Sequence, residues 1–293
     1  MIAERAPALA AFAAALTLVS FLGCATLAHN FRDLSGPKYS GSFAATGGPG
    51  AITDTNRVRV VTFNIQHSMR VPGALEALKA HAPLRNPDLL LLQEMDSAAV
   101  DTIARVLRLN YVYYPASIHP HTQKLFGNAV MSPWPIEASR KVLLPHPSRV
   151  IEQQRVAVAV RVRIAGRHVR AYSVHLGSPS GIGPAARKDQ ARAVLADAIR
   201  SPDPVIIGGD MNSYGVGWTY VEGGFTWATA EIGRTSSRFS IDHVFARGFS
   251  PYAGRQAGVV RDVHDVSDHL PVWAEFVFAP AAAPAAASAP AGS

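Results

Sequence analysis

The stretch VIIGGDMNSYG, residues 205–215, predicts a short buried strand that ends in polar side chains. Three apolar residues begin it, two glycines follow, and Asp210 and Asn212 come where the strand must end. Residues i and i+2 of an extended segment point to one side, so Asp210 and Asn212 can face one ligand together. The glycines allow another strand or a ligand to approach the backbone closely. Taken alone, the pattern is equally typical of an Asx-turn that closes a strand.

Segments on both sides of this stretch alternate between strand and helix patterns. Strand patterns occupy residues 58–65, 88–93, 155–164, 168–176, 238–246 and 270–278. Helical patterns occupy residues 72–81, residues 97–109 with Ser97 as the expected N-cap, and a segment opened by Pro184. In 155–164 every second residue is valine or isoleucine, and Arg155, Arg161 and Arg163 lie on the other face, which predicts one packed face and one more polar face. Strands outnumber helices, so we expect packed sheets with helices outside.

Polar side chains recur where the other predicted strands end or begin. Asn64 ends the first strand, Glu94 follows LLLLQ, and His175 follows AYSV. Two Asp-His pairs, 242–243 and 268–269, lie in SIDHVF and VSDHLPV. Each is typical of a turn or a cap when considered alone. Their recurrence at nearly every strand end instead indicates one shared site.

Seven motifs along the chain resemble the endonuclease/exonuclease/phosphatase superfamily, and they come in the order of that family. They are FNI at 63–65, LLQE at 91–94, GNAVMS at 127–132, SVHL at 173–176, GGDMN at 208–212, IDHVF at 241–245 and SDHLPV at 267–272. The resemblance covers essentially all of residues 58–278. It implies an α/β (α+β) fold, a four-layer α/β/β/α sandwich in which two mixed sheets lie face to face with helices outside.

The resemblance also implies Mg²⁺-dependent hydrolysis of a phosphate ester, with Mn²⁺ as an alternative cation. It makes Glu94 the principal metal ligand, assisted by Asn64, and Asp268 a second ligand or one that acts through water. Asn128 matches a position that lines the substrate phosphate. The chemistry of the cation agrees, because Mg²⁺ prefers oxygen ligands, keeps several waters and needs only one or two carboxylates.

The remaining matches imply the residues that carry out the reaction. Asp210 and Asn212 are implied to align and activate the attacking water. His269 is implied to pair with Asp242, which holds the orientation of the imidazole ring, and His175 to donate to a phosphate oxygen. Such a site suits a phosphate ester, because the transition state spreads charge that imidazoles and a metal can stabilise.

Departures from the family pattern bear on the substrate. Abasic-site endonucleases of this family usually have NGLR after the first asparagine, whereas this chain has NIQHSMR, and Pro133 stands where an arginine is common. The sequence has no clear basic patch interleaved with aromatic residues. A repair nuclease is therefore disfavoured, but lipid headgroups, small phosphoesters and nucleic acid stay open as substrates. The doublet HPH, 119–121, is interpreted as loop.

The two ends of the chain differ in composition from the middle. Residues 1–28 contain an uncharged apolar run and the only cysteine, Cys24, in FLGC, which resembles a lipobox. This run fits a cleaved signal, an uncleaved membrane anchor or a lipoprotein signal with Cys24 lipidated. A buried helix of a soluble protein is a less favoured alternative. We expect a flexible tether over residues 29–57 and the catalytic domain over residues 58–278. The Ala/Pro-rich composition predicts a disordered tail over residues 279–293. We expect a membrane-anchored or secreted, extracytoplasmic monomer.

Composition excludes some classes of function. The chain has 293 residues and a formal charge of +7, and its single cysteine excludes an internal disulfide or a cysteine-rich zinc site. Five of its 28 basic side chains are lysine, and an arginine-rich surface suits phosphate. The leading hypothesis is a membrane-anchored, metal-dependent phosphoesterase, either a phosphodiesterase or a phosphatase, and a phosphodiesterase of lipid or small substrates is favoured over a nuclease. The alternatives are a nuclease and a non-catalytic binding module on the same fold.

Overall fold

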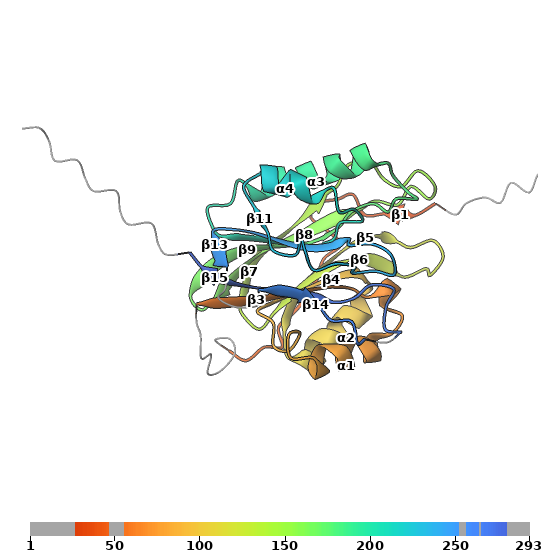
Figure 1. The fold of residues 1–293 in the computed structure, drawn as a ribbon. Coiled ribbons are helices and arrows are strands. Elements are labelled where there is room, and N and C mark those ends of the chain that lie inside the picture. The colour runs from red at the N-terminus through yellow and green to blue at the C-terminus, as the bar shows by residue number, and fades with distance from the viewer. Residues whose placement is uncertain (1–26, 47–55, 252–255, 264, 280–293) are drawn as a thin grey trace, which may run out of the picture.

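Two mixed β-sheets pack face to face, with a pair of helices on each outer surface (Figure 1). The computed structural model describes residues 27–46, 56–251, 256–263 and 265–279. The four-layer α/β/β/α sandwich expected from the sequence is thereby confirmed. The segment before residue 27, which includes Cys24, and the tail from residue 280 lie outside the described residues. No helix within the described part is both long and apolar enough to span a bilayer.

The larger sheet has nine strands in the order β1-β5-β6-β4-β3-β15-β13, with β2 paired to β5 and β14 paired to β15. Its strands are β1 His29–Asn30, β2 Tyr39–Gly41, β3 Arg57–Asn64, β4 Leu89–Met95, β5 Asn110–Ile118, β6 Leu125–Ser132, β13 Phe249–Pro251, β14 Ala257–Val259 and β15 Val272–Phe278. Only β3 and β4 pair in parallel. Their carboxyl ends therefore meet at one edge of the sheet.

The smaller sheet has six strands in the order β11-β12-β10-β9-β8-β7. Its strands are β7 Ile136–Leu143, β8 Val156–Ile164, β9 Arg167–His175, β10 Val205–Asp210, β11 Thr226–Trp227 and β12 Asp242–Arg247. Here only β9 and β10 are parallel, and their carboxyl ends meet in the same way. The connection between them contains a helix, as parallel neighbours require.

The helices cover the outer face of each sheet. Helices α1 (Val71–Ala80) and α2 (Ser97–Leu107) pack on the larger sheet, and α3 (Pro184–Ala198) and α4 (Gly217–Glu222) on the smaller one (Figure 1). A third apolar cluster fills the space between the sheets. The predicted N-cap of α2 was wrong by one residue, because Asp96 accepts the backbone N–H of Ala99.

The two glycines of β10 allow close approach of neighbouring chains. A Cβ at position 208 would lie 2.6 Å from Cδ1 of Leu91, which belongs to the opposite sheet. A Cβ at position 209, where φ is +149°, would collide with the backbone of Val174 on β9. Close packing of strands therefore explains the glycines before Asp210.

Two expectations from the sequence need correction. Residues 29–57 do not form a tether throughout, because β1 and β2 lie in this segment and both pair with β5. The second face of β8 is not polar along its length, because Ala157 and Ala159 are buried in the cluster beneath α3 and α4. Short strands at a sheet edge and small buried residues give little signal in a sequence.

Asn128 crosses the interior between the sheets. Its side-chain nitrogen donates to the carbonyl oxygens of Val156 at 2.8 Å and Ser173 at 3.4 Å, in fully buried surroundings. We expect Asn128→Ala to lower the free energy of unfolding by about 2–3 kcal/mol, because the carbonyl groups lose a partner in a dry interior. Urea unfolding measures this, with Thr102→Ala on the exposed face of α2 as a control expected to change stability by less than about 0.5 kcal/mol. Equal stability of both variants would contradict it.

His243 is fully buried beside Trp227, with 4.9 Å between ring centroids, and neither ring nitrogen has a hydrogen-bond partner among the described residues. Burial is the main reason that the pKa of His243 is lowered to about 4. The unfolded chain therefore takes up a proton near the ordinary histidine value of about 6.5, whereas the fold does not until about pH 4. Stability should consequently fall as the pH drops through this window, by about 2 kcal/mol at pH 5 from this group.

The prediction is that His243→Phe reduces this loss of stability, because phenylalanine keeps a planar ring and binds no proton. Thermal unfolding at pH 7 and at pH 5 measures it, with the exposed His146→Phe as the matched control. A stability difference between the two pH values that is the same in wild type and His243→Phe would contradict the assignment.

Candidate active site

The carboxyl ends of the parallel strand pairs bring the predicted site residues together at one end of the sandwich. Asn64 ends β3 and lies opposite Gln93 of β4, the residue before Glu94. In the other sheet Asp210 is opposite both His175 of β9 and Asp242 of β12. Three neighbouring strands therefore carry a row of ionisable side chains, and the register of the sheet sets this row.

Glu94 leaves the regular strand geometry. Its φ is +59°, and the pairing of β4 with β6 shifts register between Leu92 and Met95. A bulge of this kind changes the direction of a side chain at the end of a strand. The Glu94 carboxylate accepts the backbone N–H of His67 at 3.2 Å, and the His67 ring Nε2 lies 3.3 Å from the same oxygen.

Asn64 connects two carboxylates from different sheets. Its side-chain nitrogen donates to Glu94 at 3.2 Å and to Asp210 at 3.1 Å. Its side-chain oxygen accepts the backbone N–H of Gln66 at 3.1 Å. This geometry favours a positioning role for Asn64, and ligation of a metal by its oxygen stays a prediction.

Asp210 is almost completely buried and is held by several donors. Asn212 donates its backbone N–H at 2.8 Å and its side-chain nitrogen at 3.3 Å. The ring Nε2 atoms of His175 and His269 lie 3.3 Å and 3.7 Å from one Asp210 oxygen. Burial raises the pKa of Asp210 to about 7, against the opposing effect of His269. A carboxylate with such a pKa is suited to accept a proton near neutral pH.

His269 is paired with Asp242, as the sequence predicted. Its Nδ1 lies 2.9 Å from Asp242 Oδ2, which also accepts the hydroxyl of Thr235 at 2.6 Å. Burial opposes the charge, but the carboxylates of Asp242 and Asp210 raise the pKa of His269 to about 11. The imidazolium is therefore fixed in orientation and keeps its charge at neutral pH.

Arg155 is a site residue that the sequence did not single out. Its guanidinium Nη1 lies 3.0 Å from Nδ1 of His175, and the guanidinium carbon lies 5.0 Å from the centroid of the Phe126 ring. Burial, followed by the charge of Arg155, lowers the pKa of His175 well below its usual range. His175 is therefore neutral and Arg155 carries the positive charge on this side of the site.

Two predicted residues are placed differently from the central group. Asp268 is exposed, and its carboxylate lies 3.3 Å from the Ser267 hydroxyl, which donates to the Asn64 carbonyl oxygen at 2.7 Å, so the part of Asp268 in binding a metal stays a prediction. Asn128 does not line a phosphate site, because its amide hydrogens are donated to carbonyl oxygens between the sheets. Asn128 was predicted to contact phosphate only because of its position in the motif. The direction of its side chain depends on which face of β6 lies against the other sheet.

Thr235 and His67 were also missed. Thr235 lies in a loop, and its hydroxyl oxygen accepts the backbone N–H groups of Ile241 and Asp242, both at 3.0 Å. The same hydroxyl donates its hydrogen to the Asp242 carboxylate. His67 lies in the short 3₁₀ turn Gln66–Ser68 after β3. The only sequence feature that pointed to His67 was its place in NIQHSMR, the stretch that differs from the NGLR of abasic-site endonucleases.

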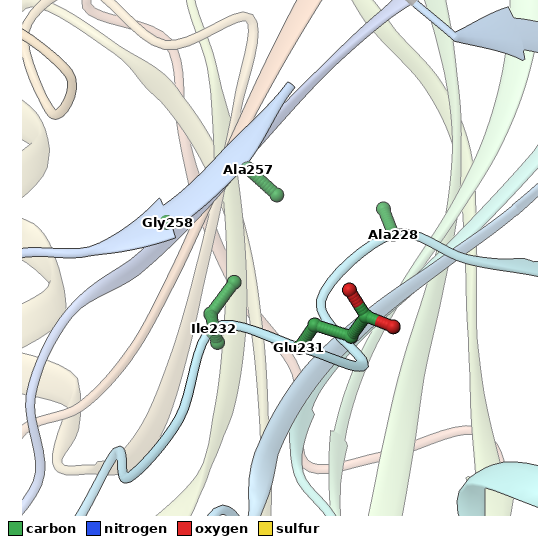
Figure 2. Close-up of a pocket in the computed structure, with 5 residues that line it drawn as sticks. All are labelled: Ala228, Glu231, Ile232, Ala257 and Gly258. Carbon is green, nitrogen blue, oxygen red and sulfur yellow. The ribbon is translucent and has the colours of Figure 1, made fainter. Parts of the chain in front are cut away.

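The acidic groups converge enough to attract a cation. Ligand atoms of Asp210, Asp242 and His269 lie within 4.8 Å of one another, the only such group among the described residues. Asp242 and His269 already bond to each other, whereas Glu94 has a partly exposed carboxylate close to Asp210. A separate pocket lies beside β14 and is lined by Ala228, Glu231, Ile232, Ala257 and Gly258 (Figure 2). None of the site residues lines that pocket.

Comparison with solved structures shows relatives of the same fold. An endonuclease/exonuclease/phosphatase from Bacteroides vulgatus has 17% identity and a TM-score of 0.62, covering 76% of this chain and 99% of that chain. A humanized D. rerio TDP2 has 18% identity and a TM-score of 0.59, with 75% and 99% covered. The human Nocturnin catalytic domain with bound sulfate has 17% identity and a TM-score of 0.59, with 83% and 98% covered.

Sequence comparison with curated proteins finds no match. The low identities to solved structures show a shared fold and nothing finer. In contrast, residues 61–269 match the Endonuclease/Exonuclease/phosphatase family, which is more than half of the sequence. The chain therefore belongs to the endonuclease/exonuclease/phosphatase family, whose members are hydrolases that act on phosphate esters.

Proposed function

We propose that the domain is a Mg²⁺-dependent phosphodiesterase. The observation that carries the proposal is the convergence of Glu94 and Asp210, from opposite sheets, beside the Asp242–His269 pair. Family membership supplies the reaction class, and this group supplies acids, bases and charge in one place. A non-catalytic binding module would have lost acidic residues of this group, and here they are all present.

The site fits a divalent cation. Carboxylates of Glu94, from one sheet, and of Asp210, from the other, share the side-chain nitrogen of Asn64, with Asp242 next to Asp210 across the strand pairing. We propose that Glu94 is the principal ligand, with Asn64 and Asp268 assisting, and that Mg²⁺ or Mn²⁺ is the cation. When bound, such a cation polarises a phosphoryl oxygen and neutralises part of the negative charge.

The protein residues divide the remaining work. Asp210, with its raised pKa, accepts a proton from the attacking water, and Asn212 fixes the position of that carboxylate. The His269 imidazolium stabilises negative charge on the phosphoryl group, while Asp242 holds its ring. His175 and Arg155 offer further N–H donors on the β9 side of Asp210, away from the Asp242–His269 pair.

We propose an extracytoplasmic substrate with a lipid headgroup or another small alcohol. The support is the uncharged run of residues 7–28, which would hold the domain near a bilayer as an anchor or as a lipoprotein with Cys24 modified. Nucleic acid is the alternative substrate, and a D. rerio TDP2 structure of the same fold contains a single-stranded DNA product. Direct assay separates these substrates.

One prediction of this proposal concerns the cation. Wild-type protein should hydrolyse bis-p-nitrophenyl phosphate with Mg²⁺ and lose this activity in EDTA. Glu94→Gln should have no detectable activity or should need far more Mg²⁺, because an amide keeps the shape but lacks the charge. Glu231→Gln, which changes an exposed carboxylate in the pocket beside β14, is the matched control. Full activity in EDTA, or an unaffected Glu94→Gln variant, would refute metal-dependent hydrolysis by this site.

The same preparation identifies the substrate. Plasmid DNA, sphingomyelin and phosphatidylinositol phosphates should be assayed beside bis-p-nitrophenyl phosphate. We expect turnover of a lipid to exceed turnover of DNA. Faster cleavage of plasmid DNA would favour the nuclease alternative.

A second prediction concerns the Asp242–His269 pair. His269→Ala should lower kcat by about 10²–10⁴-fold, the usual contribution of a positioned acid or base. Asp242→Asn should reproduce much of this loss, because its proposed work is to orient and charge the ring. Steady-state turnover measures both, with melting temperature showing that each variant is folded. If both variants stay within about threefold of wild type, well below that contribution, the pair has no catalytic role.

A further inference from the structure

Three histidines form a cluster beside Glu94 that the proposed reaction does not use. His67 lies in the turn after β3, and His119 and His121 lie in the loop that joins β5 to β6. The ring centroids of His67 and His119 are 4.5 Å apart, and those of His119 and His121 are 5.5 Å apart. We call these three residues the histidine wall.

The histidine wall adjoins the catalytic residues on the side of Arg155. Nε2 of His67 lies 3.3 Å from Oε2 of Glu94. The ring of Phe126 has its centroid 5.3 Å from His67, 5.5 Å from His119 and 5.8 Å from His175. Any group held by the wall is therefore next to a group held by Glu94 and His175.

The backbone that places His67 is unusual. Gln66, His67 and Ser68 all have positive φ, at +31°, +54° and +56°. Non-glycine residues rarely adopt this region, and several in succession persist only when the surrounding structure imposes them. The result of this conformation is that the His67 ring faces both Glu94 and His119.

The wall has an unfilled hydrogen-bonding position and an excess of basic groups. Nδ1 of His67 is buried without a partner in the described part of the chain. Burial is the main cause that lowers the pKa of His119 to about 4, so its ring is neutral at neutral pH and offers one N–H donor. Glu94 is the only carboxylate that forms an ion pair with a wall histidine among the described residues, and the proposed cation would occupy it. An anion would therefore complement the wall.

We infer that the histidine wall binds a second phosphate group of the substrate, beside the phosphate ester that is cleaved. The inference rests on the proposed function, since it assigns the cleaved ester to Glu94 and Asp210. Imidazole N–H groups and the Arg155 guanidinium are suitable donors to phosphate oxygens. The unpartnered Nδ1 of His67 is one such donor position beside Glu94.

The test compares two substrates that differ by one phosphate. They are the p-nitrophenyl ester of thymidine 5′-phosphate and the same ester with an additional 3′-phosphate. We expect wild-type protein to prefer the second by about tenfold or more in kcat/KM, mainly through KM, which matches one or two charge-assisted hydrogen bonds. The double variant His119→Ala with His121→Ala should reduce this preference to about twofold.

A matched control and a second pair of substrates complete the design. His168→Ala removes a histidine at the other end of β9, where it pairs with Glu137, and should keep the preference. Vesicles of phosphatidylinositol and of phosphatidylinositol 4-phosphate, each in phosphatidylcholine, show whether a lipid headgroup or a nucleotide supplies the second phosphate. Circular dichroism and melting temperature verify that each variant is folded.

Equal kcat/KM for both substrates of each pair in wild type, or an equal loss on both in the double variant, would overturn the inference. Calorimetry with thymidine 3′,5′-bisphosphate and thymidine 5′-phosphate gives a reading that needs no turnover. Absence of hydrolysis with tighter binding of the bisphosphate would refute the proposed function alone. Equal binding of the two nucleotides, or Zn²⁺ binding that depends on His119 and His121 without phosphate preference, would refute the second phosphate site.

Discussion

One amide nitrogen connects the two sheets at the active site. Asn64 donates to Glu94 of its own sheet and to Asp210 of the opposite sheet, at 3.2 Å and 3.1 Å. These contacts require the carboxyl ends of β3, β4 and β10 to meet closely. Gly208 permits that approach, because a larger residue would meet Leu91 across the interface. The close packing of the two sheets is thus a condition for the hydrogen bonds of Asn64 to both carboxylates.

Charge balance is the second requirement. Asp210, Asp242 and His269 are all buried, and isolated buried charges are costly unless they are paired and hydrogen-bonded. The imidazolium of His269 neutralises one of the two aspartates, and Thr235 and Asn212 satisfy further oxygen lone pairs. The raised pKa of Asp210 shows that its anionic form is incompletely compensated, and the Glu94 carboxylate is partly exposed, so a divalent cation would stabilise the ionised form of both. The same balance makes Asp210 a suitable proton acceptor.

Much of this arrangement can be predicted from the sequence. Polar residues at strand ends, such as Asn64, His175 and Asp210, need only a strand pattern and a position. Their proximity follows because parallel strands bring carboxyl ends to one edge. The direction of Asn128 could not be predicted, since it depends on which sheet face is inward. Arg155 was missed because nothing in the sequence distinguishes it from Arg161 and Arg163. It reaches the site because it directly precedes β8, at the end of the strand that lies beside His175.

Loops account for the other omissions. His67, His119 and Thr235 meet the site through turns whose shape depends on tertiary contacts, and their spacing has no regular period. The strands β1 and β2 escaped prediction because two or three residues carry too little pattern to distinguish an edge strand from a tether. The central claim, that Glu94 and its neighbours hold a cation between the sheets, depends on none of these loops.

Anomalous diffraction from crystals grown with Mn²⁺ tests this claim most directly. The account predicts a peak bonded to the Glu94 carboxylate, at about the 2.0–2.2 Å expected for a small hard dication on oxygen, on the side that faces Asp210. A peak found only between Asp210, Asp242 and His269, or no peak at Glu94 at saturating Mn²⁺, would contradict it.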